Sequence, residues 1–134
     1  MSTRGLPMSS RRYTGPSPET VNRVLLRDGW RCVRSGEDIG GTRGLDYVIH
    51  HRRPRGLGGS RRADTNDCAN LLTLCTPCHV HVESHRGEAL SNGWLVPQGT
   101  DPATVGCLVE HGSRFVYLSA DGSYSESPPE RDAA

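Results

Sequence analysis

The first apolar pattern in the chain has the spacing of one helix face. Val21, Val24 and Leu25 recur at the three- and four-residue intervals that place side chains on a single stripe. The pair Ser17-Pro18 precedes the stripe, and a serine cap followed by a first-turn proline is typical of a helix start. Gly29 follows the stripe, so the pattern predicts a helix that begins after the serine and ends at this glycine.

Two apolar segments and a second helix signal follow. Residues 45–51 contain strand-forming Tyr, Val and Ile, and residues 70–74 form another apolar segment beyond a Gly- and Arg-rich loop at 55–67. The pair Thr76-Pro77 repeats the cap-and-proline signal and predicts a helix that reaches about Arg86. The chain thus predicts strand, loop, strand and helix in succession, which is a small ββα unit.

The C-terminal part of the chain predicts a hairpin followed by a tail. Residues 105–110 and 114–119 have strand character, with a His-Gly-Ser turn between them. The first residues are rich in Ser, Arg, Gly and Pro, and the last are polar, which is typical of unstructured termini. The expected organisation is a flexible basic arm at 1–16, a central domain at 17–97, a β-hairpin extension at 98–120 and a disordered tail at 121–134.

The composition predicts a small core. Of the 134 residues, 34% are hydrophobic and 5% aromatic, and a fold with so little to bury often depends on a bound metal or a disulfide. The chain has no apolar run near the ~20 residues that span a bilayer. Its N-terminus lacks the apolar stretch of a signal peptide. We therefore expect an intracellular, cytoplasmic protein with no membrane partner.

Charge is divided unequally along the chain. All 16 basic side chains are Arg. Residues 1–66 hold 13 of them with 6 acids, a formal charge of +7, whereas residues 67–134 hold 3 with 9 acids, a charge of −6. A basic half beside an acidic half indicates one face for a polyanion, although a solvated charged surface would have the same composition.

The residues with the most chemistry lie in and around the predicted ββα unit. Two imidazoles, His50-His51, end the first strand, Asn70 begins the second, and Cys75-Thr76-Pro77-Cys78-His79 leads into the helix. Neutral imidazoles bind divalent metals, and an imidazole held off the metal acts as a base near neutral pH. The combination indicates metal-assisted hydrolysis, with a phosphodiester as the expected substrate.

This stretch resembles the HNH endonuclease motif, and most of all the Cys-flanked HNH proteins of actinobacterial bacteriophages. The resemblance covers about residues 20–97. It implies an α+β fold, the small ββα-metal (His-Me finger) fold, with an N-terminal helix and a C-terminal β-hairpin extension. By position it implies that His51 is the general base, that His50 and His79 bind metal, and that Asn70 holds the base in the right orientation and tautomer. It also implies one catalytic divalent ion: Mg²⁺, Mn²⁺, Ni²⁺ or Zn²⁺.

A third ligand follows from helical spacing. Glu83 lies four residues after His79, which puts both side chains on one face of the predicted helix. The alternative is an exposed carboxylate without a ligand role, and His81 and His85 are neighbouring candidates that point elsewhere on the helix. A set rich in imidazole favours a borderline ion over Mg²⁺ in affinity, whereas the ion available in the cell can override that preference.

The cysteines indicate a second, structural metal site. Five cysteines with a tight Cys-x-x-Cys pair favour metal over a disulfide framework. In the resembling proteins two such pairs hold a structural Zn²⁺, which implies Cys32, Cys75 and Cys78 as ligands here. Ser35 stands where the fourth thiolate belongs, and a hydroxyl is a poor zinc ligand. Three outcomes stay open: three-Cys zinc completed by water or another side chain, substitution by Cys68, or an empty knuckle held by packing or a disulfide.

The expected function is cleavage of DNA. Arginines beside and after the imidazoles are expected to contact phosphates: Arg52, Arg53, Arg55, Arg61 and Arg62. The resemblance implies an endonuclease that nicks or cuts DNA, is encoded by a phage, and assists DNA packaging with the terminase large subunit in the host cytoplasm. Two alternatives remain. A non-catalytic zinc-knuckle module that binds nucleic acid fits the Ser35 lapse, and a redox or metal-storage protein explains the cysteines but not the imidazoles.

Overall fold

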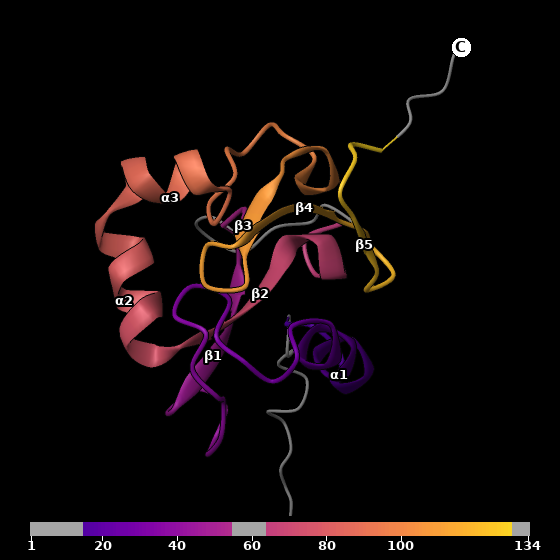
Figure 1. Cartoon of the computed structure of the whole chain (residues 1–134). Coiled ribbons are helices and arrows are strands. Elements are labelled where there is room, and N and C mark those ends of the chain that lie inside the picture. Colours follow the sequence, from indigo (N-terminus) through magenta and orange to yellow (C-terminus); the bar gives the residue numbers. More distant parts are fainter. Residues whose placement is uncertain (1–14, 55–63, 130–134) are drawn as a thin grey trace, which may run out of the picture.

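The structure describes residues 15–54 and 64–129. In this computed structural model, three α-helices and two small antiparallel sheets form an α+β fold, the class that the sequence predicts (Figure 1). The flexible arm expected at 1–16 falls almost entirely outside the described residues. The same holds for three of the expected phosphate contacts, Arg55, Arg61 and Arg62.

Helix α1 spans Pro18–Arg27 and has the predicted start. The Ser17 side chain accepts a hydrogen bond from the backbone N–H of Thr20 at 3.1 Å, which satisfies a donor that the helix itself cannot. The three residues of the apolar stripe are buried. Gly29 follows the helix with a φ of 69°, a left-handed conformation that glycine adopts without strain, and there the chain turns away from the helix.

Strands β1 (Tyr47–His51) and β2 (Leu71–Cys75) form the antiparallel pair at the centre of the molecule. Asn70 precedes β2 and does not belong to it. It ends a short 3-10 helix, Cys68–Asn70, in which its backbone N–H bonds to the carbonyl of Asp67 at 2.9 Å. The second predicted strand therefore begins one residue later than the apolar pattern indicates.

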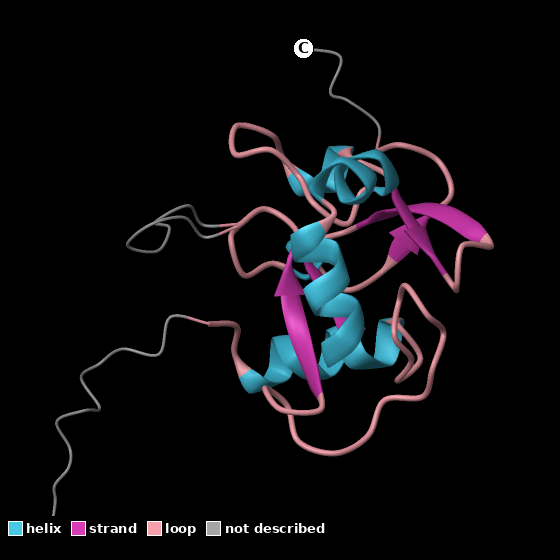
Figure 2. Cartoon of the chain, turned by 90° about the vertical axis from the view of Figure 1, so that its left-hand side faces the viewer, coloured by secondary structure: helices cyan, strands magenta, loops and turns pink. Residues whose placement is uncertain are grey.

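Helices α1 and α2 (Thr76–Ser84) lie on opposite sides of this strand pair in Figure 1, and Figure 2 shows the molecule from the α2 side. The two faces of the pair belong to different core clusters. Tyr47 and Ile49 of β1 pack in the cluster that contains α1. Leu72 and Leu74 of β2 pack in the cluster that contains the buried residues of α2. Because side chains alternate along a strand, His50 is turned toward α2 and the next histidine toward the other side.

The second predicted helix is interrupted near its expected end. Helix α2 spans Thr76–Ser84 and begins near the predicted position, but Thr76 does not cap it. Cys75 occupies the cap position without a side-chain bond, and the Thr76 hydroxyl donates to the carbonyl of Leu45 at 2.8 Å. Helix α3 follows at Arg86–Asn92. His85 separates them because its φ of −122° and ψ of 67° lie outside the helical region. Helix α3 ends at Gly93, where any side chain would collide with the carbonyl of Gly106.

The predicted C-terminal hairpin is present and has a third strand. Strands β3 (Cys107–Val109), β4 (Arg114–Leu118) and β5 (Tyr124–Ser125) form one antiparallel sheet. The disorder predicted from residue 121 therefore does not extend over β5. Both β5 residues are exposed, so no apolar alternation marks the strand. Backbone pairing with β4 holds it, together with the Arg114 guanidinium, which donates to the β5 tyrosine at 3.0 Å and to Glu126 at 2.8 Å.

The C-terminal sheet shares its core with the ββα unit. Cys107, Val116 and Leu118 are buried in the same cluster as Leu74 and Trp94. The extension expected at 98–120 is therefore packed as one body with the central domain. Within the part of the chain that the structure describes, no helix has the length and apolarity needed to cross a bilayer.

Candidate metal centre

Three side chains from β1 and α2 converge at one point. His50 comes from β1, and His79 and Glu83 come from α2, one helical turn apart. One donor atom of each lies within 4.8 Å of the other two. The Glu83 Oε2 atom is 3.7 Å from His50 Nδ1 and 3.7 Å from His79 Nε2. The structure thus brings together the three residues that the sequence predicts as ligands, and this donor set suits a borderline divalent ion.

His50 is oriented by a backbone partner. Its ring is buried, and Nε2 lies 2.8 Å from the carbonyl oxygen of Trp94. A carbonyl only accepts, so Nε2 carries the proton and the lone pair is on Nδ1, the nitrogen that faces Glu83. Burial lowers the pKa of His50 to about 4, so the ring is neutral at neutral pH. A second ring nitrogen bound to a carbonyl is the common arrangement of a metal-binding histidine.

The trio is accessible from the α2 side. The side chains of His79 and Glu83 are 34% and 43% exposed, whereas that of His50 is 1% exposed. Arg86, at the start of α3, places its Nη1 atom 3.5 Å from Glu83 Oε1. The trio is therefore open to solvent on the side of the helix, next to a cation that the sequence pattern gave no reason to single out.

Two neighbouring histidines, His81 of α2 and His85 directly after it, belong to a different group. The rings of His81 and His85 stack with 4.0 Å between their centroids. His81 Nε2 also lies 2.8 Å from the carboxylate of Glu88. Neither histidine joins the cluster around Glu83. Of the candidates on this helix, the pair with four-residue spacing, His79 and Glu83, is the one that meets β1.

His51 meets an amide that the sequence reasoning missed. The ring is half-buried, and its Nε2 atom lies 2.8 Å from Oδ1 of Asn66. An amide oxygen only accepts, so Nε2 carries the proton and the lone pair is on Nδ1. Asn66 therefore selects the tautomer of His51. Its sole signal in the sequence is an amide in the predicted loop, close to Asn70.

Asn70 does not orient His51 directly, which corrects the role expected for it. Its side chain is fully buried, and Oδ1 accepts from the backbone N–H of Arg53 at 2.7 Å. Nδ2 donates to the carbonyls of Arg53 at 3.2 Å and Thr65 at 2.8 Å. These bonds tie together the two ends of the loop between β1 and β2. Asn70 thus acts on His51 only indirectly, by holding the backbone on either side of it and of Asn66.

Arg52 is a buried structural residue, so its expected role in phosphate contact is wrong. The side chain is 0% exposed. Its guanidinium donates to the carbonyls of Ala69, Gly93 and Val105 at 2.8 Å and of Pro102 at 3.0 Å. A buried charge is tolerated only when its donors are satisfied, and here four carbonyls from three backbone segments satisfy them.

Arg53 is also buried, at 1% exposure, and the same correction applies. Its guanidinium pairs with the carboxylate of Asp64 and donates to the carbonyl of Thr100 at 3.0 Å. Both arginines directly follow a strand, a position at which charged residues commonly face solvent. Their partners lie far away in the sequence, so local patterns could not indicate burial.

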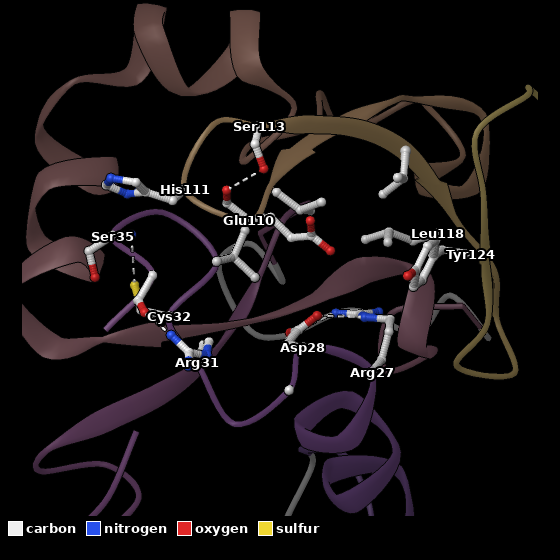
Figure 3. A pocket seen from close by; sticks show the side chains of 15 residues that line it. Arg27, Asp28, Arg31, Cys32, Ser35, Glu110, His111, Ser113, Leu118 and Tyr124 are labelled. Carbon is white, nitrogen blue, oxygen red and sulfur yellow. Dashed lines mark hydrogen bonds and ion pairs between the residues drawn. The ribbon is translucent and has the colours of Figure 1, made fainter. Parts of the chain in front are cut away.

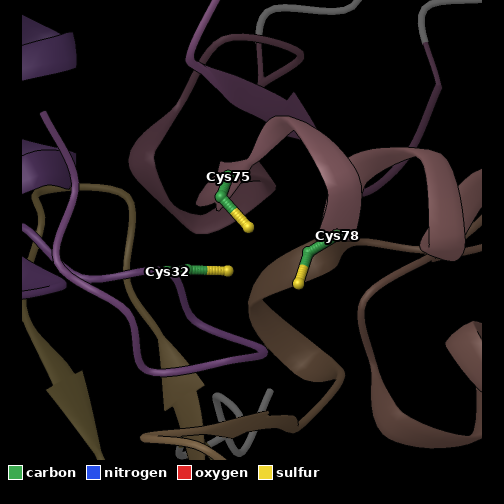
Figure 4. Close-up of side chains that lie close together, drawn as sticks. All are labelled: Cys32, Cys75 and Cys78. Carbon is green, nitrogen blue, oxygen red and sulfur yellow. The ribbon is translucent and has the colours of Figure 1, made fainter. Parts of the chain in front are cut away.

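A second group of possible ligands is formed by three thiols. Cys75 precedes α2, Cys78 lies in its first turn, and Cys32 comes from the loop after α1 (Figure 4). Their sulfur atoms lie within 4.8 Å of one another, a buried arrangement compatible with a bound metal such as Zn²⁺. Burial opposes ionisation of Cys32, yet hydrogen bonds from Ser35 leave the pKa of this thiol below its ordinary value. Burial raises the pKa of Cys75 to about 11.

Ser35, which the sequence predicts at the position of the missing fourth ligand, contacts two of the three thiols. Its backbone N–H donates to Cys32 Sγ at 3.4 Å, and its Oγ atom is 4.0 Å from Cys75 Sγ. Substitution by Cys68 is not found, because Cys68 is buried in the cluster with α1 and is not part of the thiol group. A disulfide is not found either, because all five cysteines are free thiols.

Comparison of the chain with protein-family models, with curated proteins and with solved structures found no match.

Proposed function

We propose that this chain is a metal-dependent HNH endonuclease with a ββα-metal fold, which hydrolyses phosphodiester bonds of DNA. One observation carries the proposal: His50, His79 and Glu83 converge from the strand and the helix of the motif. The candidate base, His51, directly follows His50 in the same strand. Metal-assisted hydrolysis requires a set of metal ligands with a base close to it, and this arrangement provides both.

The proposed base is the Nδ1 atom of His51. Asn66 keeps the proton of the ring on Nε2, so Nδ1 has the lone pair that accepts a proton from the attacking water. Asn70 holds the loop that carries Asn66, which keeps the base in place. A divalent ion held by His50, His79 and Glu83 would stabilise the negative charge that develops on the phosphate oxygens.

The proposed brace beneath this site is a zinc ion at Cys32, Cys75 and Cys78. Cys75 and Cys78 flank the start of α2, the helix that carries His79 and Glu83. A metal here would fix the start of that helix to the loop after α1. Structural zinc contributes to folding directly, which suits a chain with a small apolar core.

The proposed DNA contacts are made to the backbone. Arg86 lies beside the trio and is 55% exposed, which supports a role for it in contacting a phosphate next to the scissile bond. The basic N-terminal half supplies further contacts, without Arg52 and Arg53 because both are buried. From the resemblance alone we also propose a phage-encoded enzyme that works with the terminase large subunit in the host cytoplasm.

The test is nicking of supercoiled plasmid by the purified chain with Mg²⁺, Mn²⁺, Ni²⁺ or Zn²⁺. We expect relaxed circular DNA with at least one ion, and none with His51→Ala. The matched control is His85→Ala, which removes an imidazole that lies outside the trio and should leave nicking unchanged. DNA binding without nicking under every ion would exclude the enzyme and favour the non-catalytic binding module.

A further inference from the structure

The thiol group has three strong donors and two polar neighbours, Ser35 and Arg34. The Arg34 guanidinium donates to Cys78 Sγ at 3.4 Å, and a guanidinium cannot bind a metal ion because it has no acceptor. Structural zinc sites are almost always four-coordinate, with sulfur or nitrogen ligands. The hydroxyl of Ser35 lies 4.0 Å from Cys75 Sγ, in place of a fourth thiolate. A neutral hydroxyl is a poor zinc ligand, so a site built on these thiols calls for a better donor from elsewhere in the chain.

A cavity of about 570 Å³ opens beside Ser35 (Figure 3). It lies between the end of α1, the loop that carries Cys32, and the turn that joins β3 to β4. Cys32, Ser35 and His111 all line the cavity, and in Figure 3 their side chains lie toward the same end of it. The cavity therefore gives the imidazole room to turn toward Cys32, the one thiol of the group that lines the cavity with it.

The β3–β4 turn rests on the loop that carries Cys32 and Ser35. His111 donates its backbone N–H to the carbonyl of Val33 at 3.3 Å. A Cβ atom added to Gly36 would lie only 3.2 Å from the Cβ atom of His111. The absence of a side chain at Gly36 thus lets His111 approach this loop closely.

The backbone of the turn is strained where it carries the imidazole. Glu110 and His111 have φ values of 52° and 60°, in the left-handed region that residues with a Cβ atom rarely adopt. Glycine or asparagine would form such a hairpin turn with less strain. Strained residues gather at functional sites, where the surrounding structure holds them in place. Here one of the two strained residues is His111, whose imidazole lines the cavity beside the thiol group.

We propose that His111 is the fourth ligand of the zinc site formed by Cys32, Cys75 and Cys78. The inference rests on the proposal that these thiols hold zinc and goes beyond it by naming the residue that completes the set. The imidazole is not among the mutually close donor atoms, so ligation requires its ring to rotate toward the side now taken by Ser35. The resulting site would be of the Cys₃His type and would link the C-terminal sheet to the ββα unit.

The test is a titration of the whole chain with Co²⁺, whose absorption reports its ligands. Charge transfer from thiolate to cobalt arises only where cysteine binds the ion. This absorption band therefore reports binding at the thiol group and not at the trio of His50, His79 and Glu83. His111→Asn is the variant of choice, since asparagine tolerates a left-handed turn and its amide is a poor zinc ligand. We expect the visible bands to shift and the affinity for Co²⁺ and Zn²⁺ to fall by more than about tenfold. Loss of a residue that only hydrogen-bonds to a ligand already lowers metal affinity by about tenfold or more, so loss of a ligand should lower it further.

Two further variants decide what a loss of affinity means. His85→Asn removes an imidazole outside both metal groups and should leave bands and affinity unchanged. Ser35→Cys, added to His111→Asn, supplies a fourth thiolate and should restore the affinity. Parental bands and affinity in His111→Asn would overturn the inference and leave a three-thiol site standing. A loss that Ser35→Cys does not restore would also overturn it, whereas no thiolate band in the parent chain would overturn the zinc site as well.

Discussion

The Nε2 atom of His51 lies 2.8 Å from the amide oxygen of Asn66, a residue on the far side of the loop between β1 and β2. The other amide near this loop, that of Asn70, is engaged entirely with backbone groups. One amide therefore selects the protonated nitrogen of the ring, and the other holds the chain around it. The two residues should respond differently to substitution.

Asn66→Ala should lower the nicking rate with little change in stability. Without the amide oxygen, the ring loses the contact that keeps its proton on Nε2. A general base contributes about 10²- to 10⁴-fold, and we expect part of that factor, about tenfold, to be lost from kcat and not KM. Single-turnover nicking by Asn66→Ala and by Asn22→Ala, an exposed amide on α1, measures the difference. Equal rates for the two variants would exclude an orienting role for Asn66.

Asn66→Asp should shift the pH dependence of nicking. A carboxylate at this distance stabilises the protonated imidazole and therefore raises the pKa of His51. The acid limb of the pH–rate profile should move to higher pH, because the base becomes deprotonated only at higher pH. A residue with a purely structural role would change the height of the profile and leave its position unchanged.

Asn70→Ala should destabilise the fold. The substitution leaves the backbone N–H of Arg53 and two buried carbonyls without their partners, at a cost of about 3 kcal/mol in unfolding free energy. Urea unfolding followed by circular dichroism measures the change, again with Asn22→Ala as the control. Full stability combined with lost nicking would instead return Asn70 to a direct role in catalysis.

Arg52→Lys should also destabilise the protein, although the charge is kept. A single ammonium group cannot reach the four carbonyls that the guanidinium joins, so the loss should be about 3 kcal/mol or more. Arg86→Lys is the matched control, because that side chain is exposed and should tolerate the change. If Arg52→Lys unfolds like the parent but binds DNA more weakly, the residue is a phosphate contact after all.

Glu83→Gln should weaken binding of a divalent ion at the trio by at least about tenfold. The amide oxygen is a weaker donor than the carboxylate, and the pair with His79 and His50 is lost. Isothermal titration with Mn²⁺ or Ni²⁺ gives the affinity. Glu88→Gln provides the comparison, since Glu88 pairs with His81 outside the trio and should bind the ion as the parent does.

Parts of this molecule that depend on local spacing could be predicted from the sequence. The start of α1 follows from Ser17 and Pro18. For α2 the proline indicates the start to within one residue, whereas the predicted cap, Thr76, is already the first helical residue. The meeting of His79 with Glu83 follows from helical geometry. The approach of His50 was expected from the order strand, loop, strand, helix and from its resemblance to a known motif.

Other parts depend on contacts between distant segments, which leave no local pattern. The four carbonyls that bind Arg52 come from three separate segments, so nothing near the residue in the sequence indicates that its charge is buried. The path of the loop between β1 and β2 decides which amide contacts His51. The spacing of Asn66 and Asn70 in the sequence does not indicate that path. Strand β5 is exposed and is held by its backbone, so it lacks the alternation that identifies a strand.

The guanidinium of Arg52 limits how far this protein can be shortened. Two of its acceptors, the carbonyls of Pro102 and Val105, lie beyond the end of the recognisable motif at residue 97. A version cut at that point would retain every proposed ligand of the trio and the base, yet would leave the arginine beside them with a buried charge and vacant donors. The smallest unit able to fold is thus longer than the smallest unit that contains the proposed site, so a change far from the trio can abolish the function by unfolding the chain.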